Sequence, residues 1–405
     1  MESLKFLMVS THYPPAHLGG DAIFVEYLSN ELVRAGHEVE VFHNPHVYAL
    51  MRGHLPNLDR VTPGGVHRTT YQSTFGRTDP VLSLMFGRGP SSVRQFRDIA
   101  SRLKPDVIHW HNTKGFIGRP VATPDALSIY TAHDYFVVCP RSNLLRPGKK
   151  TCEHAFLCQS CLLRWAKPPQ LWRACGMRVV KLPKELVVIS PSEFLAKRLQ
   201  RDGIKVDYVL RNFATDRGLI SPRSDAIRLV YLGTLERTKG LMTLLEAFNI
   251  SKDCQGFSLS IFGGGPQRME LESRIKTLGL EGRVKLHGFV PLDRIKDTLS
   301  DAAAIVMPSE SYENAPLSAI EALSMGFPLI GTDVGGIPEI LGPESGSVLV
   351  PPGSPTRLAE EIVNFWNNRG MLSEHRGKAR AAYDSFYSPE AHLKAYLRIV
   401  RDRLA

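Results

Sequence analysis

Residues 5–43 read "KFLMVSTHYPPAHLGGDAIFVEYLSNELVRAGHEVEVFH" and introduce a pattern that returns along the chain. A short apolar run at 5–10 is followed by a loop with prolines and glycines, then by an amphipathic stretch and a second apolar run at 38–43. This order is typical of a strand, a helix and a second strand of a parallel sheet. The stretch therefore predicts the first unit of an α/β fold.

The same alternation continues along the chain and restarts after Pro222. The further apolar runs that predict strands are "DVIHWH" (106–111), "LSIYTAHD" (127–134), "LVVIS" (186–190), "IRLVYLG" (227–233), "FSLSIFGGG" (257–265), "VKLHGFV" (284–290), "AAIVMPS" (303–309) and "FPLIGTD" (327–333). With 405 residues the chain is too long for one ordinary core. We therefore predict two Rossmann-like domains, each with a doubly wound parallel sheet.

The boundary between the domains is predicted in residues 211–225, "RNFATDRGLISPRSD". Here the apolar periodicity lapses, and Gly, Pro, Ser and Asp accumulate. The last periodic stretch, within 386–405, begins with a Ser-Pro-Glu helix signal and is long enough to pack across both domains. The sequence thus predicts domains over 1–212 and 213–385, followed by a C-terminal helix.

Most of the formal charge of +10 comes from one segment. Between Arg141 and Lys184 stand ten basic residues and one acidic residue, Glu153, together with Trp165 and Trp172. Such a segment suits an anionic surface, either phospholipid head groups or the phosphates of an acceptor, while a solvated basic face is an equally good interpretation. No nucleic-acid-binding motif accompanies the charge, so nucleic acid is not a predicted partner.

The start of the chain differs from a secretory signal. Its apolar run is broken by Ser10, Thr11 and His12, and prolines follow. No window of about 18 residues is apolar throughout, so no membrane span is predicted. The sequence predicts a cytoplasmic protein, and the basic segment leaves peripheral contact with the inner face of the plasma membrane as an open alternative.

Residues 312–326, "YENAPLSAIEALSMG", place two glutamates eight positions apart around a predicted helix. Asn314 suits an N-cap, and the helix should run from about Pro316 to Met325. Its N-terminus would offer free N–H groups to a phosphate. Glu313 and Glu321 could each accept hydroxyl hydrogen bonds, one from a transferred sugar and one from a ribose. The alternative is an acidic first turn with one solvent-facing glutamate.

Three other stretches add groups that could bind a nucleotide. Arg237 and Lys239 lie in a turn between a predicted strand and a predicted helix, where cations could reach a diphosphate. Gly264 lies in a glycine turn after another strand, where bare backbone could approach a nucleotide. In the N-terminal half, Gly19 and Gly20 directly precede a helix. A lone glycine turn is weak evidence for a nucleotide site, so the three stretches are interpreted together.

In this order, the motifs resemble those of glycosyltransferase family 4, whose members are retaining enzymes with the GT-B fold. Glu313 and Glu321 match the E-x7-E motif of that family, and "AGHEVEVF", "VVISPSEFLAKRL", "GTLERTKG", "GGGP" and "GFPLIGTDVGGIPEI" extend the resemblance over the whole chain. The resemblance implies two domains that face a cleft. The N-terminal domain would bind the acceptor and the C-terminal domain the nucleotide-sugar donor, with the C-terminal helix crossing back to the N-terminal domain.

The resemblance also implies roles for single residues. Glu321 would bind the ribose, Glu313 the donor sugar and Lys239 the diphosphate, and His133 in "YTAHDY" would lie near the reacting sugar. We predict His133, Glu313 and Lys239 as catalytic residues. The predicted donor-binding residues are Gly20, Arg237, Lys239, Gly264, Glu313, Asn314, Ala315, Pro316, Leu317 and Glu321. Family members often carry arginine where this chain has Thr234, and Arg237 is the substitute that we predict.

The predicted reaction transfers a sugar from a nucleoside diphosphate, UDP or GDP, to a hydroxyl of a glycan or lipid-linked glycan, with retention of configuration. Surface polysaccharide assembly is the expected setting. No DxD-like motif accompanies the cleft motifs, so no cofactor is expected for catalysis. His133 and Glu313 would position substrates, while His109 and His111 are interpreted as core histidines. The alternative is a catalytically inactive GT-B scaffold or binding protein.

Four of the six cysteines fall within 23 residues, at Cys139, Cys152, Cys158 and Cys161. In a cytosolic protein this clustering indicates a metal before disulfides. The closing C-x2-C has the spacing of half a tetrahedral Zn²⁺ site, although twelve residues separate the first two cysteines. We predict a structural Zn²⁺ site with these four ligands. His154 is an alternative ligand, and free thiols are the alternative interpretation.

Overall fold

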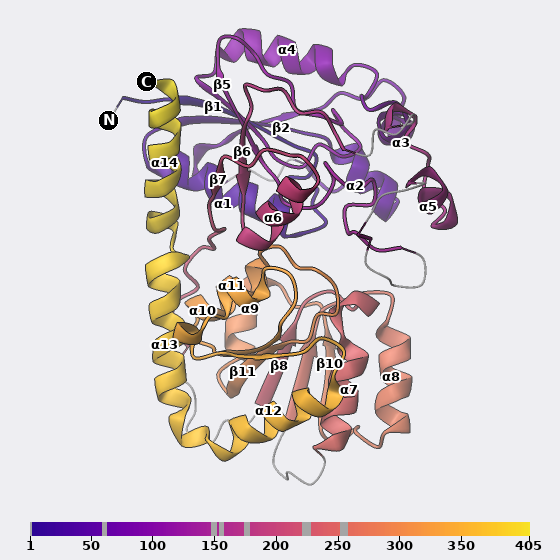
Figure 1. Cartoon of the computed structure of the whole chain (residues 1–405), viewed down its shortest axis with the longest axis vertical. Helices are drawn as coiled ribbons and strands as arrows, with labels where there is room; N and C mark the ends of the chain where they lie inside the picture. Colours follow the sequence, from indigo (N-terminus) through magenta and orange to yellow (C-terminus); the bar gives the residue numbers. More distant parts are fainter. Residues whose placement is uncertain are drawn as a thin grey trace. The chain divides into compact units, whose positions relative to one another are not determined.

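The computed structural model describes residues 2–58, 63–146, 152–153, 158–173, 179–220, 228–251 and 258–405. The chain divides into two compact units (Figure 1). Unit 1 comprises Met1–Asn212 and His392–Ala405, and unit 2 comprises Phe213–Ala391. Each unit is built on one parallel sheet with helices packed against it, which confirms the predicted α/β class.

The sheet of unit 1 has the strand order β3-β2-β1-β4-β5-β6-β7, and all of its described pairs are parallel. The strands are β1 (Lys5–Ser10), β2 (Glu38–His43), β3 (His67–Thr70), β4 (Val107–Trp110), β5 (Leu127–Thr131), β6 (Val187–Ser190) and β7 (Tyr208–Val209). The central strands β1 and β4 are almost entirely buried, as expected for continuous apolar runs covered on both faces. The order reverses between β1 and β4, which makes the carboxyl ends of these strands a topological switch point.

The helices of unit 1 are α1 (Gly20–Arg34), α2 (Pro45–Arg52), α3 (Asp79–Phe86), α4 (Ser92–Leu103), α5 (Cys158–Arg164), α6 (Glu193–Arg201) and α14 (Pro389–Leu404). Helix α1 buries Val25, Leu28 and Leu32, which lie three or four positions apart and so share one face. Helix α13 of unit 2 ends at Phe386, and α14 begins at Pro389. Proline is favoured in the first turn of a helix. Its residues from His392 onward belong to unit 1.

The sheet of unit 2 repeats the same topology, with the order β10-β9-β8-β11-β12-β13. Its strands are β8 (Arg228–Leu232), β9 (Ser258–Phe262), β10 (Val284–Gly288), β11 (Ala302–Met307), β12 (Leu329–Thr332) and β13 (Val348–Val350). Its helices are α7 (Leu241–Ile250), α8 (Arg268–Thr277), α9 (Leu292–Ile295), α10 (Leu317–Ser324), α11 (Ile337–Ile340), α12 (Pro355–Asn367) and α13 (Leu372–Phe386). The core includes Leu244, Phe248, Ile261, Val306 and Ile362. The switch point of this sheet lies between β8 and β11.

Among the helices that the structure describes, none combines the length and the apolarity that crossing a bilayer requires.

Candidate functional site

In unit 2, two loops meet at the switch point of the sheet. The loop after β8 contains the 3-10 turn Arg237–Lys239, and the loop after β11 starts at Pro308. Glu310 N donates to Thr238 O at 2.8 Å, which joins the two loops. Gly240, with φ +70°, lies so close to Pro308 O that no Cβ would fit. The backbone therefore holds both loops in one place.

This arrangement brings the predicted residues Lys239 and Glu313 together. Lys239 Nζ donates to Glu313 Oε1 at 2.5 Å, and Ser309 Oγ donates to the same oxygen at 3.0 Å. Both members of the ion pair are partly exposed, so they remain open to a ligand. Because an ammonium group has three donors, the pair leaves Lys239 able to bind a phosphate while it holds Glu313.

Glu321 has a cationic partner that sequence reasoning missed. Arg217 Nη2 donates to Glu321 Oε1 at 2.8 Å, and Arg217 N donates to Ser324 Oγ at 3.3 Å. Glu321 is buried on α10, so the alternative of a solvent-facing glutamate does not hold. Arg217 lies in the aperiodic stretch 211–225, near the start of unit 2, where no local pattern indicates a function. A carboxylate has about four acceptor sites, so Glu321 can accept from Arg217 and from hydroxyl groups at once.

The start of helix α10 differs from the prediction. The helix begins at Leu317, and its N-cap is Pro316, not Asn314. The reason is that Pro316 takes an extended ψ of 116°, which keeps Asn314 outside the helix. The proline side chain accepts no hydrogen bond, and Ala319 N donates to Pro316 O at 3.1 Å, so the N–H groups of Leu317 and Ser318 have no side-chain cap. Asn314, Ala315, Pro316 and Leu317 thus form the approach to this helix end.

Two other predicted donor-binding residues lie on neighbouring loops of unit 2. Arg237 Nη2 contacts both carboxylate oxygens of Glu270 on α8 at 3.1 Å, and both side chains are exposed. Gly264 is surrounded by open space, since a Cβ there would meet nothing within 4 Å. Its neighbour Gly263 has φ +140°, and Gly265 packs against the backbone of Leu235. The fold itself therefore requires glycine at 263 and 265 but not at 264.

In unit 1, polar residues gather at the carboxyl ends of β1, β4 and β5. Gly20 is the first residue of α1, and the next residue, Asp21, accepts a hydrogen bond from Asn112 Nδ2 at 2.9 Å. Asn112 follows β4, and His133 follows β5. Asp21 and Asn112 were not predicted as site residues, although Asp21 stands directly after the glycine pair. The switch point of unit 1 thus carries a second polar site.

His133 is half-buried in this second site. Burial lowers the pKa of His133 to about 4, and the nearby carboxylate of Asp21 only partly opposes this effect. The imidazole is therefore neutral near pH 7. His133 Nε2 hydrogen-bonds with His111 Nδ1 at 3.0 Å, and Phe24 packs against its ring. A neutral, oriented imidazole suits the predicted role as a positioning group.

His109 and His111 form the core behind His133. His109 hydrogen-bonds with Thr131 Oγ1 at 2.8 Å and with the hydroxyl of Tyr396 at 2.9 Å, so the core interpretation of His109 is confirmed. His111 is also buried, but it contacts His133 directly. Tyr396 lies on α14. The last helix of the chain is thereby linked to His133 through two buried histidines.

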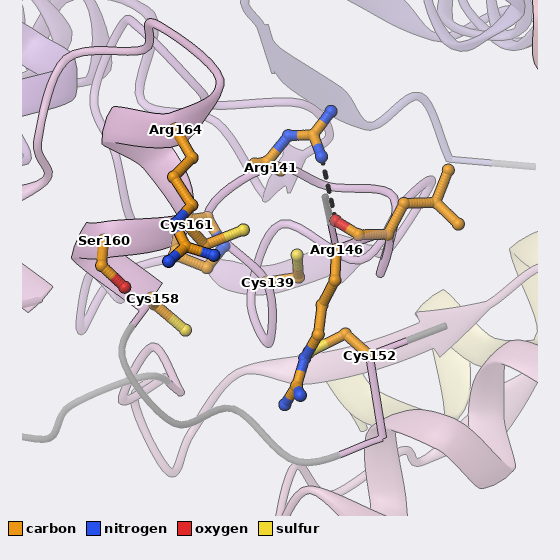
Figure 2. Close-up of a pocket in the computed structure, with 10 residues that line it drawn as sticks. Cys139, Arg141, Arg146, Cys152, Cys158, Ser160, Cys161 and Arg164 are labelled. Carbon is orange, nitrogen blue, oxygen red and sulfur yellow. Dashed lines mark hydrogen bonds between the residues drawn. The ribbon is translucent and has the colours of Figure 1, made fainter. Parts of the chain in front are cut away.

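The four clustered cysteines, Cys139, Cys152, Cys158 and Cys161, are not joined in disulfides, and they line one pocket of unit 1 (Figure 2). Across the described part of the chain, no three His, Cys, Asp or Glu side chains stand as a ready metal site. The alternative ligand His154 lies outside the described residues.

The basic segment around these cysteines is not all surface. Arg173 is buried, stacks on Phe136 and Trp172, and donates to Phe136 O at 2.5 Å. Burial lowers its pKa to about 10. Arg173 therefore stabilises the segment, while the other described cations can face an anionic partner.

Two family models match the chain, one on each unit. The model described as "Glycosyltransferase Family 4" matches residues 18–211, and the model described as "Glycosyl transferases group 1" matches residues 214–382. Together they cover the loops that carry His133, Lys239, Glu313 and Glu321.

Curated relatives and solved structures agree with these matches. An uncharacterized glycosyltransferase of Methanocaldococcus jannaschii is 26% identical over 93% of each chain, and glycogen synthase of Mycobacterium tuberculosis is 27% identical over 83% of this chain and 80% of its own. Sucrose-phosphate synthase from Thermosynechococcus elongatus has a TM-score of 0.73 with 21% identity, covering 98% of both chains. HepE of Anabaena, solved with UDP, has a TM-score of 0.67 with 17% identity over 98% of this chain and 100% of its own.

These likenesses to solved structures show the fold, which is the GT-B fold predicted from the sequence. The family models add one glycosyltransferase match on each unit. The chain therefore belongs to glycosyltransferase family 4.

Proposed function

We propose that this protein transfers a sugar from a nucleoside-diphosphate sugar to a hydroxyl of a glycan or lipid-linked glycan, with retention and without a metal ion in the transfer step. The observation that carries the proposal is the pairing of Lys239 with Glu313 beside the uncapped start of α10. A cation, a carboxylate and free N–H groups at one place suit a diphosphate joined to a sugar.

Each group has a distinct role in this proposal. Lys239 and the first turn of α10 bind the diphosphate, while Glu313 accepts hydrogen bonds from the sugar hydroxyls. Glu321, held by Arg217, binds the ribose. During transfer, negative charge grows on the diphosphate as the bond from the anomeric carbon to its oxygen breaks. Preorganised donors that face this charge lower the barrier without rearranging.

The acceptor would bind in unit 1. Its hydroxyl forms the new bond to the anomeric carbon on the face from which the diphosphate leaves, and its proton passes to a departing phosphate oxygen. His133, neutral near pH 7, orients the reacting groups and is not needed as a base. Retention follows because the entering and leaving oxygens share one face of the sugar.

The relatives support a nucleotide-sugar donor. The structure of Anabaena HepE in complex with UDP-glucose has a TM-score of 0.66 with this chain. A polysaccharide acceptor fits the glycogen synthase relative and the amylovoran biosynthesis glycosyltransferase of Erwinia amylovora, which is 32% identical over 34% of this chain. The basic segment, with exposed Trp165, suits peripheral contact with an anionic membrane at the cytoplasmic face.

The test is nucleotide release from a panel of UDP-, GDP- and ADP-sugars, with and without EDTA. We expect one donor to be turned over, equally well with EDTA, and Glu321→Ala to lose most of this activity. Glu360→Gln is the matched control, because Glu360 is an exposed glutamate of the same unit. If no sugar nucleotide is cleaved and none raises the Tm, the chain is a binding scaffold and the proposal fails.

A further inference from the structure

The pocket of the four cysteines is not used by the proposed reaction. Its volume is about 220 Å³, and Cys139, Cys152, Cys158 and Cys161 line it together with Arg141, Arg146 and Arg164. The cysteines come from three places: the segment after β5, a loop, and helix α5. Figure 2 shows all four of them around one space. Three short segments within 23 residues of sequence thus bring four thiols to one site.

We propose that this pocket is a structural zinc site in which the four cysteines bind one Zn²⁺ as thiolates. Four thiolates around zinc form a closed tetrahedral site, with each sulfur about 2.3 Å from the metal. The side chains do not yet stand at that spacing, since no three metal-binding groups among the described residues form a ready site. Binding of the metal would draw the four sulfurs that line the pocket closer together.

The charge around the pocket favours this ligand set. Binding releases four protons, one from each thiol, and the resulting centre of one Zn²⁺ and four thiolates carries a net charge of −2. Three arginines, Arg141, Arg146 and Arg164, line the same pocket and compensate this charge.

Anchoring contacts explain what the metal would hold in place. Arg198 of α6 donates to Cys152 O at 2.9 Å, and Cys152 N donates to Leu144 O at 2.6 Å. Cys139 N donates to Tyr135 O at 2.6 Å, two residues after His133. A zinc ion here would therefore connect the segment that follows His133 to α5 and to the loop fixed on α6. This inference goes beyond the proposed function and does not rest on it.

The experiment measures metal in the full chain, purified with reductant and without added chelator. We expect about one zinc per chain, released in proportion when a mercurial reagent titrates the thiols. We also expect the d–d absorption of a tetrahedral thiolate site when Co²⁺ replaces zinc. Cys158→Ser and Cys161→Ser should each lose most of the zinc, whereas the matched control Cys254→Ser, in unit 2, should keep it.

Two results would overturn the proposal. One is wild-type protein without zinc that also fails to bind added Zn²⁺ or Co²⁺. The other is intact mass spectrometry of protein purified without reductant that shows disulfides among these four cysteines in place of metal. The Co²⁺ spectrum and the thiol titration use the wild-type chain, so the proposal stays testable if a serine variant does not fold. Neither readout depends on transferase activity.

Discussion

Replacing Gly335 with alanine tests how the turn after β12 positions Glu313. Gly335 has φ +66°, and a Cβ there would lie 2.7 Å from Glu313 N and closer still to Glu313 O. The next residue, Gly336, donates from its N–H to Glu313 O at 2.6 Å. Because the turn and the Glu313 backbone fit directly against each other, a methyl group at position 335 must displace one of them.

The size of the effect follows from two costs. The left-handed conformation costs alanine roughly 1–2 kcal/mol, which corresponds to a Tm about 2–8 °C lower for a unit of this size. The contact with Glu313 N alone must lengthen from 2.7 Å to the 3.0 Å that real Cβ atoms need, and because Glu313 O lies closer still, the Glu313 backbone must shift by more than this difference. A misplacement of about 1 Å can cost 100-fold in rate, so we expect kcat/KM to fall by about 10- to 100-fold.

The assay compares kcat/KM for donor turnover and the Tm of wild type, Gly335→Ala and Gly342→Ala. Gly342 is the control, because its φ is −57° and a Cβ there meets nothing within 4 Å. Gly342→Ala should behave like wild type. A folded Gly335→Ala protein whose kcat/KM stays within about twofold of wild type would refute the reasoning, because Glu313 would then not depend on this turn.

Three further predictions concern Gly264, Arg217 and His133. Gly264→Ala should keep the Tm, because the space beside Gly264 is open in the fold. It should raise the donor KM by roughly tenfold, because the added methyl group would occupy space that we propose for the donor. Gly282→Ala, which also meets nothing within 4 Å, should change neither the Tm nor the KM. Arg217→Gln should lower the free energy of unfolding of unit 2 by about 1–3 kcal/mol in a urea titration, because buried Glu321 loses its cation; an unchanged value would contradict this. Since the pKa of His133 is about 4, against 6.5 when unfolded, protons bind the unfolded chain first as pH falls. The free energy of unfolding should thus decrease from pH 6.5 to 4, less steeply in His133→Asn, and equal slopes would count against this.

The sequence predicted the regular elements well because both sheets are buried on both faces. Fully buried parallel strands must be apolar throughout, so runs such as Lys5–Ser10 and Ala302–Met307 stand out. The glycine-rich loops between strands and helices are equally visible. These local signals were sufficient for the α/β class and the element order.

The pairing of charged residues could not be read in the same way. Lys239 and Glu313 are 74 positions apart, and Arg217 and Glu321 are 104 apart. No local periodicity links residues at such separations, because only the register of the sheet brings their loops together. The prediction of Asn314 as the N-cap of α10 was wrong for a different reason. Asn314 is a favourable cap by type, but the backbone conformation of Pro316 decided where the helix begins.

The site of unit 1 was only partly predictable. His133 was identified through its motif, but its contact with His111 and the link from His109 to Tyr396 depend on stacking between strands and a distant helix. The cysteine spacing indicated a cluster, and the structure places the four thiols at one pocket. Which groups surround them could not be known without the fold.

The path of the chain has a consequence for how the protein is made on the ribosome. Residues 1–212 emerge first, yet the hydrogen bonds of Tyr396 with His109 and of His392 with Arg211 need the last turns of the chain. Unit 2 can fold as soon as its own residues have emerged, since domains generally fold as units during synthesis. Unit 1 must wait with an uncovered histidine core until α14 has also emerged, so the unit whose synthesis begins first is completed after unit 2.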